Sequence, residues 1–232
     1  MVEITWLGHA TFKFRLDNGE VIVIDPFIDG NPVYPKNHTF DRVDTILVTH
    51  AHFDHVQGAL PLSRKFGARI VAIYETAVWL ESKGARNTLA INKGCSRQVG
   101  SVRVTMTQAL HSSGIQEDGK MLYGGEAAGY VVRVPDGRSF YFAGDTAVFG
   151  DMELIGTLYR PELALLPIGD TFTMGPAEAA MACRLLKPKK VIPMHFGTMP
   201  QLEGRPEQLA ELLRDQPEIQ VWTLEIGKPV TW

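Results

Sequence analysis

The segment "TILVTHAHFDHVQG", residues 45–58, places three histidines and an aspartate within six positions, directly after a short apolar run. The apolar run is typical of a buried strand and the residues after the cluster are typical of a helix, so the polar cluster lies where a strand ends. The composition of the chain makes a chance match to H-x-H-x-D-H a matter of roughly three in ten thousand. A solvated polar loop is therefore the less favoured interpretation.

The residue types in this cluster are those that bind transition metals. Residues two apart on an extended segment point the same way, so His50 and His52 can grip one ion, while Asp54 and His55 can address a second. Imidazole and carboxylate groups suit zinc, manganese or iron. Two ions need more ligands than these four.

Three further polar residues stand where apolar strands end. His111 follows "TMTQAL", Asp145 ends "FYFAG" and His195 ends "KVIPM". Taken singly, a histidine at a strand end is more often a structural residue whose hydrogen bonds are satisfied. Together, and in a chain that carries the H-x-H-x-D-H segment, the three favour a metal site.

The rest of the chain predicts an α/β protein with many strands. A hairpin is expected at Asn18-Gly19, and a long loop at residues 26–41, which contain three prolines. Helices are expected over 56–66, 75–83, 176–186 and 206–214, and strands over 45–49, 68–73, 101–106, 127–134, 139–145, 163–170, 190–195 and 219–226. This order predicts two mixed sheets covered by outer helices, in one domain over residues 1–232.

The composition disfavours several classes of function. A net charge of −3 provides no general attraction to nucleic acid, and no apolar run is long enough for a membrane span. The first residues lack the features of a secretory signal, so a cytoplasmic protein is expected. Cys95 and Cys183 are far apart in sequence and are expected to be reduced.

The order of the motifs "THAHFDH", "LHSS", "FAGDT" and "MHFGT" resembles that of the metallo-β-lactamase-fold hydrolase superfamily. The pieces "WLGHATF", "LPIGDTFTMGP" and "VIPMHFGT" resemble its uncharacterised metal-dependent hydrolase branch, close to the L-ascorbate-6-phosphate lactonase type. The resemblance extends from Trp6 to about Pro200, which is most of the chain.

This resemblance implies a four-layer αββα sandwich with a dinuclear metal site at the edge of its two sheets. One ion would be held by His50, His52 and His111. The other would be held by Asp54, His55 and His195, with Asp145 bridging the two. The resemblance leaves the metal open among zinc, manganese, nickel and iron.

The function expected from such a site is hydrolysis of an ester, lactone or phosphodiester bond in a small substrate. A hydroxide bridging the two ions would attack, and Asp54 would orient it and accept its proton. Alternatives are a nuclease or phosphodiesterase acting on nucleic acid, an iron-dependent redox enzyme on the same fold, and a non-catalytic metal-binding protein. A homo-oligomer is also left open.

Several other residues are candidates for supporting roles. Asp25 either holds a ligand histidine or caps the loop that Pro26 begins. His9 either lines the pocket, as proton donor or substrate contact, or makes a structural hydrogen bond. His38 is expected to be solvated, with a lid role as the alternative.

The segment "IGDTFTMGP" lies at a strand-to-helix turn and contributes three more candidates. Asp170 is expected near the site, and Thr171 or Thr173 is expected to cap the following helix. Phe172 is a candidate for substrate contact. Gly124 and Gly125 lack the residues of a phosphate-binding loop and are expected to form a turn.

Overall fold

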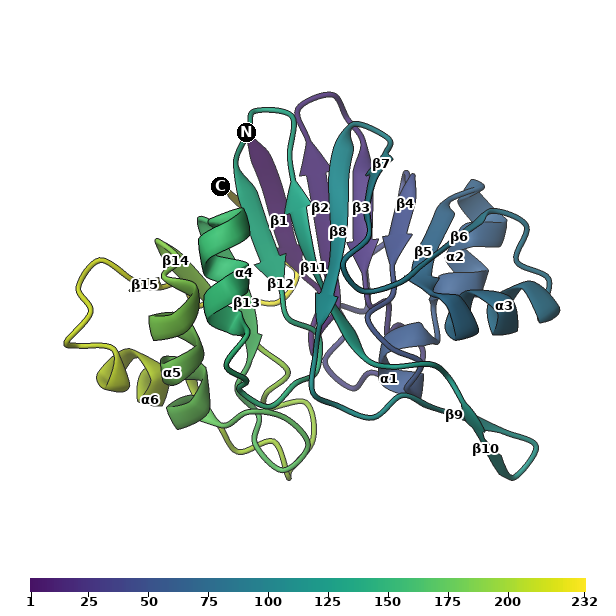
Figure 1. Ribbon diagram of the computed structural model, residues 1–232. Helices are drawn as coiled ribbons and strands as arrows, with labels where there is room; N and C mark the ends of the chain where they lie inside the picture. The colour runs from purple at the N-terminus through teal and green to yellow at the C-terminus, as the bar shows by residue number, and fades with distance from the viewer.

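Two seven-stranded sheets pack face to face and carry helices on both outer surfaces (Figure 1). The structure is a computed structural model and describes residues 1–232. In spatial order the first sheet contains β16 (Pro229–Thr231), β1 (Val2–Trp6), β2 (Phe12–Leu16), β3 (Val21–Ile24), β4 (Thr45–Leu47), β5 (Arg69–Ile73) and β6 (Thr88–Ile91). The second contains β15 (Gln220–Val221), β14 (Lys190–Met194), β13 (Leu163–Pro167), β12 (Ser139–Phe142), β11 (Ala128–Arg133), β8 (Val102–Gln108) and β7 (Ser96–Val99).

The helices form the two outer layers. The first sheet is covered by α2 (Ala59–Phe66) and α3 (Tyr74–Ser82), and the second by α4 (Met152–Tyr159), α5 (Pro176–Leu186) and α6 (Pro206–Leu212). The single turn α1 (Phe53–Val56) follows β4, and a separate hairpin of β9 (Gly114–Glu117) and β10 (Lys120–Tyr123) projects from the body (Figure 1). The expected αββα order of layers is confirmed.

The central strands have apolar residues on both faces. Each sheet therefore packs against the other sheet on one face and against helices on the other. Every residue of β3 and of β13 is buried, as in strands that are packed on both sides. Between the sheets, the ring of Phe14 stacks on that of Phe140 with their centroids 4.4 Å apart. These contacts join the two sheets through one continuous core.

All strands that lead to candidate site residues run in the same direction within their sheet. In the first sheet β1 and β3 are both antiparallel to β2, and β4 is parallel to β3. In the second sheet β8 and β12 are both antiparallel to β11, and β13 and β14 follow in parallel. The carboxyl ends of these strands therefore meet at one edge of the sandwich, the lower edge in Figure 1.

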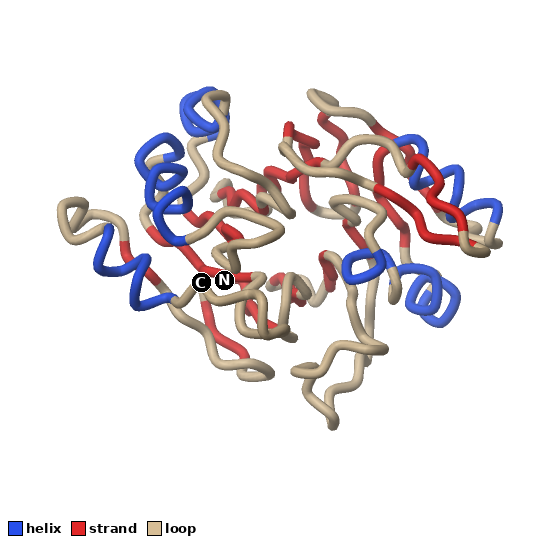
Figure 2. The backbone as a smooth tube through the Cα atoms, turned by 90° about the horizontal axis from the view of Figure 1, so that it is seen from below, coloured by secondary structure: helices blue, strands red, loops and turns tan.

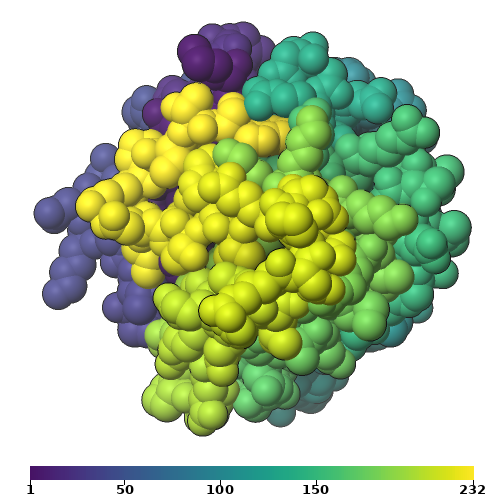
Figure 3. Space-filling model, turned by 90° about the vertical axis from the view of Figure 1, so that its left-hand side faces the viewer, coloured from purple at the N-terminus to yellow at the C-terminus, as the bar shows by residue number.

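The expected strand over 219–226 is wrong for most of its length. Only Gln220–Val221 pair with β14, and the chain then crosses to the first sheet, where β16 pairs with β1. The backbones of Val2 and Trp232 are hydrogen-bonded to each other, so the termini lie together. Figure 3 shows this C-terminal segment, in yellow, lying across the face of the molecule.

The helix expected over 56–66 begins later than expected, because α1 ends at Val56 and α2 starts only at Ala59. The break falls at Gly58, where an added Cβ would lie 2.8 Å from the carbonyl oxygen of Pro26. Pro61 lies in the first turn of α2, where its missing N–H costs no helical hydrogen bond. No helix of this structure has both the length and the apolar composition that crossing a membrane requires.

Candidate metal centre

The candidate ligands lie in loops, and in the helical turn α1, that follow the carboxyl ends of strands from both sheets. His50, His52 and Asp54 come after β4, while His111 follows β8. Asp145 and His195 follow β12 and β14. Figure 2 looks onto this edge from below and shows that loops from the two halves of the chain face each other there.

Three imidazole rings converge at one point. The Nδ1 atom of His52 lies 2.9 Å from Nε2 of His50 and 3.2 Å from Nε2 of His111. Nitrogen ligands about 2.0–2.1 Å from a shared zinc ion are separated by distances of this order. The sequence-based grouping of His50 with His52 therefore corresponds to a real cluster of donor atoms, which His111 completes.

A second group of donors lies beside the first. The carboxylate oxygen Oδ2 of Asp54 lies 3.6 Å from Nε2 of His55 and 3.8 Å from Nε2 of His195. His9 joins this group, because its Nε2 lies 2.9 Å from the same oxygen. His9 is thus inside the site, although the motif itself does not reveal this.

Asp145 lies between the two groups. Its Oδ2 is 3.0 Å from Nε2 of His195 and 3.3 Å from Nε2 of His55. The same oxygen is 3.7 Å from Nε2 of His111 and 4.0 Å from Nε2 of His50. One carboxylate oxygen therefore faces both clusters, which is the position that a bridging ligand requires.

The fully buried Asp25 fixes the orientation of His55. Its Oδ2 accepts hydrogen bonds from Nδ1 of His55 at 2.8 Å and from Oγ1 of Thr49 at 2.6 Å, and its Oδ1 accepts one from the Thr49 backbone N–H at 2.8 Å. Burial raises the pKa of Asp25, whereas His55 and Thr49 oppose the rise. Because its Nδ1 donates to Asp25, His55 turns its Nε2 toward the other carboxylates.

The neighbouring imidazoles are oriented in the same way. Thr49 Oγ1 already donates to Asp25, so it accepts the Nδ1 proton of His50 at 3.0 Å. Oγ of Ser112 lies 3.3 Å from Nε2 of His52. This network leaves the lone pairs of His50 Nε2 and His52 Nδ1 pointing at each other, an arrangement that a cation between them would stabilise.

Unpaired buried atoms show that the donor set fits a metal. Nε2 of His55, Nε2 of His195 and Oδ1 of Asp145 are buried and have no hydrogen-bond partner. The two imidazole nitrogens are close to Asp145, but their geometry does not make a hydrogen bond. Buried polar atoms without a partner are costly, and a metal ion at their common focus would remove that cost.

The charges of the cluster support the same conclusion. Burial works against protonation of His55 and His195, yet Asp145 and the other neighbouring carboxylates together outweigh it, raising the pKa of His55 well above its usual value and that of His195 to about 9. Burial also works against ionisation of Asp145, but His195 and His55 hold its pKa well below its usual value. Without a metal, the buried carboxylates are balanced only by imidazolium protons, and metal binding would replace those protons.

The remaining imidazoles are held neutral. Burial, reinforced by the neighbouring imidazoles, lowers the pKa of His50, His52 and His111. Burial and the neighbouring His195 lower the pKa of His9 to about 4. Neutral imidazole is the form that binds metals.

Backbone strain is concentrated at the same residues. His9, Asp25 and His195 have left-handed φ angles of 55°, 45° and 55°. Such a conformation costs a non-glycine residue about 1–3 kcal/mol and persists only where the surroundings impose it. Here the carbonyl oxygen of His9 accepts hydrogen bonds from the His195 N–H at 3.1 Å and from Nε1 of Trp6 at 2.9 Å, which ties the two sheets together at the site.

A pocket of about 520 Å³ opens over the donor cluster. Its lining contains five of the candidate ligands together with His9, Ser112 and Thr171. Four apolar side chains complete the wall, namely Phe53, Phe172, Met199 and Leu202. The convergent donors therefore face a space large enough for a small molecule.

Comparison with known proteins identifies the family of this chain. A beta-lactamase superfamily domain matches residues 20–196. The chain belongs to the beta-lactamase superfamily. A UPF0173 metal-dependent hydrolase of Solibacter usitatus is 62% identical over the full length of both chains, and one of Methanopyrus kandleri is 45% identical over 98% of each.

A solved structure supports the assignment. A metallo hydrolase from the archaeon Ignicoccus hospitalis superposes with a TM-score of 0.87 at 34% identity, covering 100% of this chain and 98% of that one. At these levels of identity the expectation of a metal-dependent hydrolase of this superfamily is confirmed.

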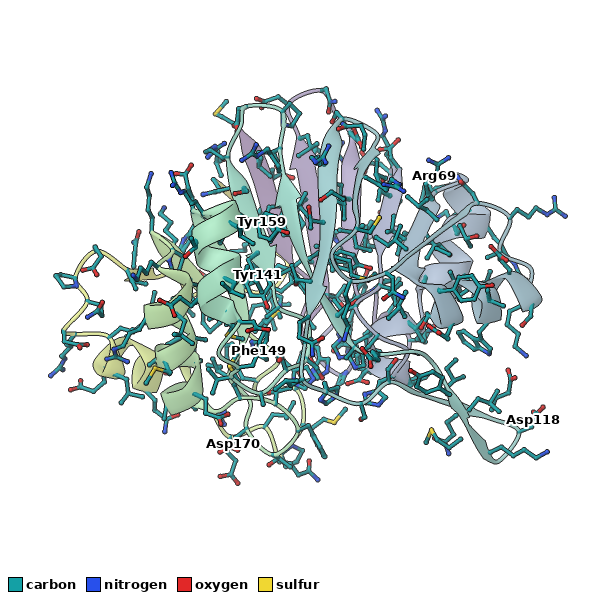
Figure 4. All side chains as sticks on the ribbon, viewed as in Figure 1. Arg69, Asp118, Tyr141, Phe149, Tyr159 and Asp170 are labelled. Atoms are coloured by element: carbon teal, nitrogen blue, oxygen red, sulfur yellow. The ribbon has the colours of Figure 1, made fainter.

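Some candidate residues of this superfamily member lie elsewhere than expected. Asp170 does not line the pocket itself, although Thr171 and Phe172 do; it accepts a hydrogen bond from the Thr171 N–H at 2.7 Å, and Figure 4 shows it at the same lower edge of the molecule as the site. Neither Thr171 nor Thr173 caps α5, whose cap residue is Gly175. Thr171 instead donates to the carbonyl oxygen of Gln201 at 3.0 Å.

Two other loop residues of the hydrolase also differ from expectation. His38 is only partly solvated, because it packs edge-on between Tyr34 and Phe40, and it does not line the pocket. Gly124 and Gly125 follow β10 in a loop, and Gly125 has a φ of 84°, consistent with the expected turn.

Sequence reasoning missed several residues of the hydrolase's site. Thr49 directly precedes His50 and Ser112 directly follows His111. Their positions next to candidate ligands could have indicated that they belong to the site. Phe53 could also have been noticed in the sequence, as an aromatic residue between His52 and Asp54. The structure leaves its side chain exposed. Met199 and Leu202 carry no local signal, because they reach the pocket only through folding of the loop after β14.

Proposed function

We propose that this hydrolase holds two divalent ions and cleaves an ester, lactone or phosphodiester bond of a small substrate. His50, His52 and His111 would hold one ion; Asp54, His55 and His195 would hold the other; and Asp145 would contact both. The observation that carries the proposal is the position of Asp145 Oδ2, within 4.0 Å of imidazole nitrogens from both groups. Two such ions would lower the pKa of a water molecule and polarise the bond to be cleaved.

Asp54 is the residue we assign to proton transfer. It lies at the wall of the pocket and its carboxylate is partly accessible, whereas Asp145 and Asp25 are buried. The pKa of Asp54 is lowered, since His55, His195 and His9 outweigh the effect of burial. A carboxylate that stays ionised can orient a water molecule and take up its proton.

His9 would position Asp54. Its Nε2 lies 2.9 Å from Asp54 Oδ2, and its lowered pKa keeps the ring neutral, so its one proton is donated to that carboxylate. This hydrogen bond would fix the orientation of the Asp54 carboxylate beside the second ion. A neutral His9 also contributes no charge to the pocket.

The test is a combined measurement of metal content and turnover. The protein is stripped with chelator, reloaded separately with Zn²⁺, Mn²⁺, Ni²⁺ or Fe²⁺, and assayed on bis-4-nitrophenyl phosphate, γ- and δ-lactones, 4-nitrophenyl esters and thioesters. We expect turnover of at least one class by protein that binds two ions per chain, and loss of turnover after chelation. Two bound ions without hydrolysis of any class would contradict the proposal.

A further inference from the structure

Beside the donor cluster, part of the wall of the pocket is apolar and open to solvent. Phe53 and Phe172 keep 62% and 55% of their surface exposed, although both line the pocket. Met199 and Leu202 complete this wall. Exposed aromatic side chains grouped at a pocket mouth mark a surface that a ligand covers.

These apolar side chains are held in place. Thr171, with a φ of 56°, donates a hydrogen bond to the carbonyl oxygen of Gln201 and so ties the loop of Phe172 to the loop of Met199 and Leu202. Leu202 is fully buried, which anchors the second loop. On the other side, Phe53 packs edge-on against Phe27, with ring centroids 5.6 Å apart.

A second hollow adjoins the pocket at Phe53, which lines both. It has a volume of about 410 Å³ and lies between α1, α2, α3 and β9. Seven of its ten lining residues are hydrophobic, among them Leu60, Trp79 and Ile115. The apolar surface beside the metal centre is therefore longer than the pocket alone.

Neither hollow has a lysine or arginine in its lining. A substrate with a phosphate or carboxylate away from the reacting bond would lose water there without gaining a cationic partner, which is unfavourable. A nucleic acid backbone would lack the phosphate contacts on which its binding depends. An uncharged apolar group would lose nothing and would cover exposed aromatic surface.

We propose that the substrate of this hydrolase carries an uncharged apolar chain or ring that lies against Phe172 and Met199 and extends across Phe53 into the second hollow. This inference rests on the proposed hydrolytic function and narrows it to apolar esters or lactones. Water adds across the acyl–oxygen bond, so an ester yields one carboxylic acid and one alcohol, and a lactone yields a hydroxy acid. Phe172 and Phe53 set specificity and take no part in the bond cleavage.

The test compares acyl chains on the metal-loaded enzyme. The substrates are 4-nitrophenyl acetate, butyrate, hexanoate and octanoate, with the mono-4-nitrophenyl ester of glutaric acid as a charged chain. We expect kcat/KM to rise about 2- to 4-fold for each added methylene, and the charged ester to fall at least about 10-fold below the hexanoate. No rise with chain length, or equal rates for the charged ester, would overturn the inference.

Substitutions in the two hollows test where the acyl chain of the substrate binds. Phe172→Ala is expected to lower kcat/KM for the hexanoate about 5- to 10-fold and that for the acetate less than about 2-fold. Leu60 lines the second hollow only, so Leu60→Lys is expected to lower kcat/KM for the octanoate and to leave kcat/KM for the butyrate unchanged. Leu158→Ala, exposed on α4 and lining neither hollow, is the matched control and should change neither.

Failure of this inference can be separated from failure of the proposed function by measuring the binding of 1-hexanol. Saturation-transfer NMR on the metal-loaded protein detects this binding. Saturable binding that Phe172→Ala weakens and Leu158→Ala preserves is expected. Hydrolysis of some substrate class without hexanol binding would overturn the inference and leave the hydrolytic function standing. Hexanol binding without turnover of any substrate would count against the function instead.

Discussion

Single residues that are not ligands determine how the ligands point. Asp25 and Thr49 together accept the Nδ1 protons of His55 and His50, so both rings present Nε2 to the centre of the site. These residues lie at the ends of neighbouring parallel strands, which places them side by side. A change at Asp25 should therefore act on metal affinity through His55.

Asp25→Asn tests this effect. The amide keeps the shape of the carboxylate, but its NH₂ group cannot accept the His55 proton, so we expect metal affinity to fall about 10- to 100-fold. Isothermal titration of chelator-stripped protein with Zn²⁺ provides the measurement. Asp29→Asn, on the exposed part of the same loop, should bind like the wild type; unchanged affinity in Asp25→Asn would refute the positioning role.

Asp54→Asn separates proton transfer from metal binding. The amide oxygen can still face the second ion, but it cannot take up a proton, so most of the metal should remain while kcat falls about 10²- to 10⁴-fold. Metal content and turnover are measured on the same sample. Full activity in this variant would remove Asp54 from the proton transfer.

At the scale of elements, the site depends on close packing between the ends of β13 and β14. A Cβ added at Gly169, just after β13, would lie 2.1 Å from the carbonyl oxygen of His195. His195 is also held by its hydrogen bond to His9, so it has no room to give way. The absence of a side chain at Gly169 is what allows His195 to reach the site.

Gly169→Ala should therefore displace His195. We expect a loss of about 1–3 kcal/mol in the free energy of unfolding, as for other overpacked positions, together with weaker binding of the second ion. Urea unfolding and metal stoichiometry are the two measurements. Gly150→Ala is the control, since a Cβ there meets nothing within 4 Å; identical behaviour of the two variants would contradict this account.

The elements that sequence could predict are those decided by local patterns. The strands around "TILVT" and "KVIPMH" have apolar runs that burial on both faces requires, and the histidines after them stand at the strand ends. Strands β7, β9 and β10 were missed because they are mostly exposed and lack such a run. Strand β16 was missed because its pairing with β1 depends on the whole chain closing on itself.

The candidate site was predictable to a similar degree. The seven ligand candidates follow from motifs and strand ends, and the structure brings them all together. The position of His9 beside Asp54 was not predictable, since it depends on how the turn after β1 meets β14 in the other sheet. For the same reason the sequence could not show that Thr171 and Phe172 line the pocket while Asp170 does not: this turn folds back on itself, as shown by the hydrogen bond from the Phe172 N–H to the Asp170 carbonyl oxygen.

At the scale of the whole molecule, the site exists only when both sheets are docked. Donors from the first sheet face donors from the second, and the core between the sheets includes the stacked rings of Phe14 and Phe140. Loss of this packing should affect both halves of the site together. Packing of the two sheets against each other therefore brings the candidate metal ligands together.

Phe140→Ala should cost about 3–5 kcal/mol in the free energy of unfolding, because it empties a fully buried position between the sheets. Chemical denaturation, followed by circular dichroism and by tryptophan fluorescence, provides the value. Leu154→Ala, on an exposed position of α4, should stay within about 0.5 kcal/mol of the wild type. A similar small effect at Phe140 would show that the inter-sheet core does not stabilise the fold.

The central claim is that two ions share Asp145, and anomalous diffraction at the zinc edge from crystals of zinc-loaded protein tests it most directly. We predict two peaks per chain, one within bonding distance of His50, His52 and His111 and one within bonding distance of Asp54, His55 and His195, with Asp145 contacting both. A single peak, or two peaks of which neither contacts Asp145, would contradict the account.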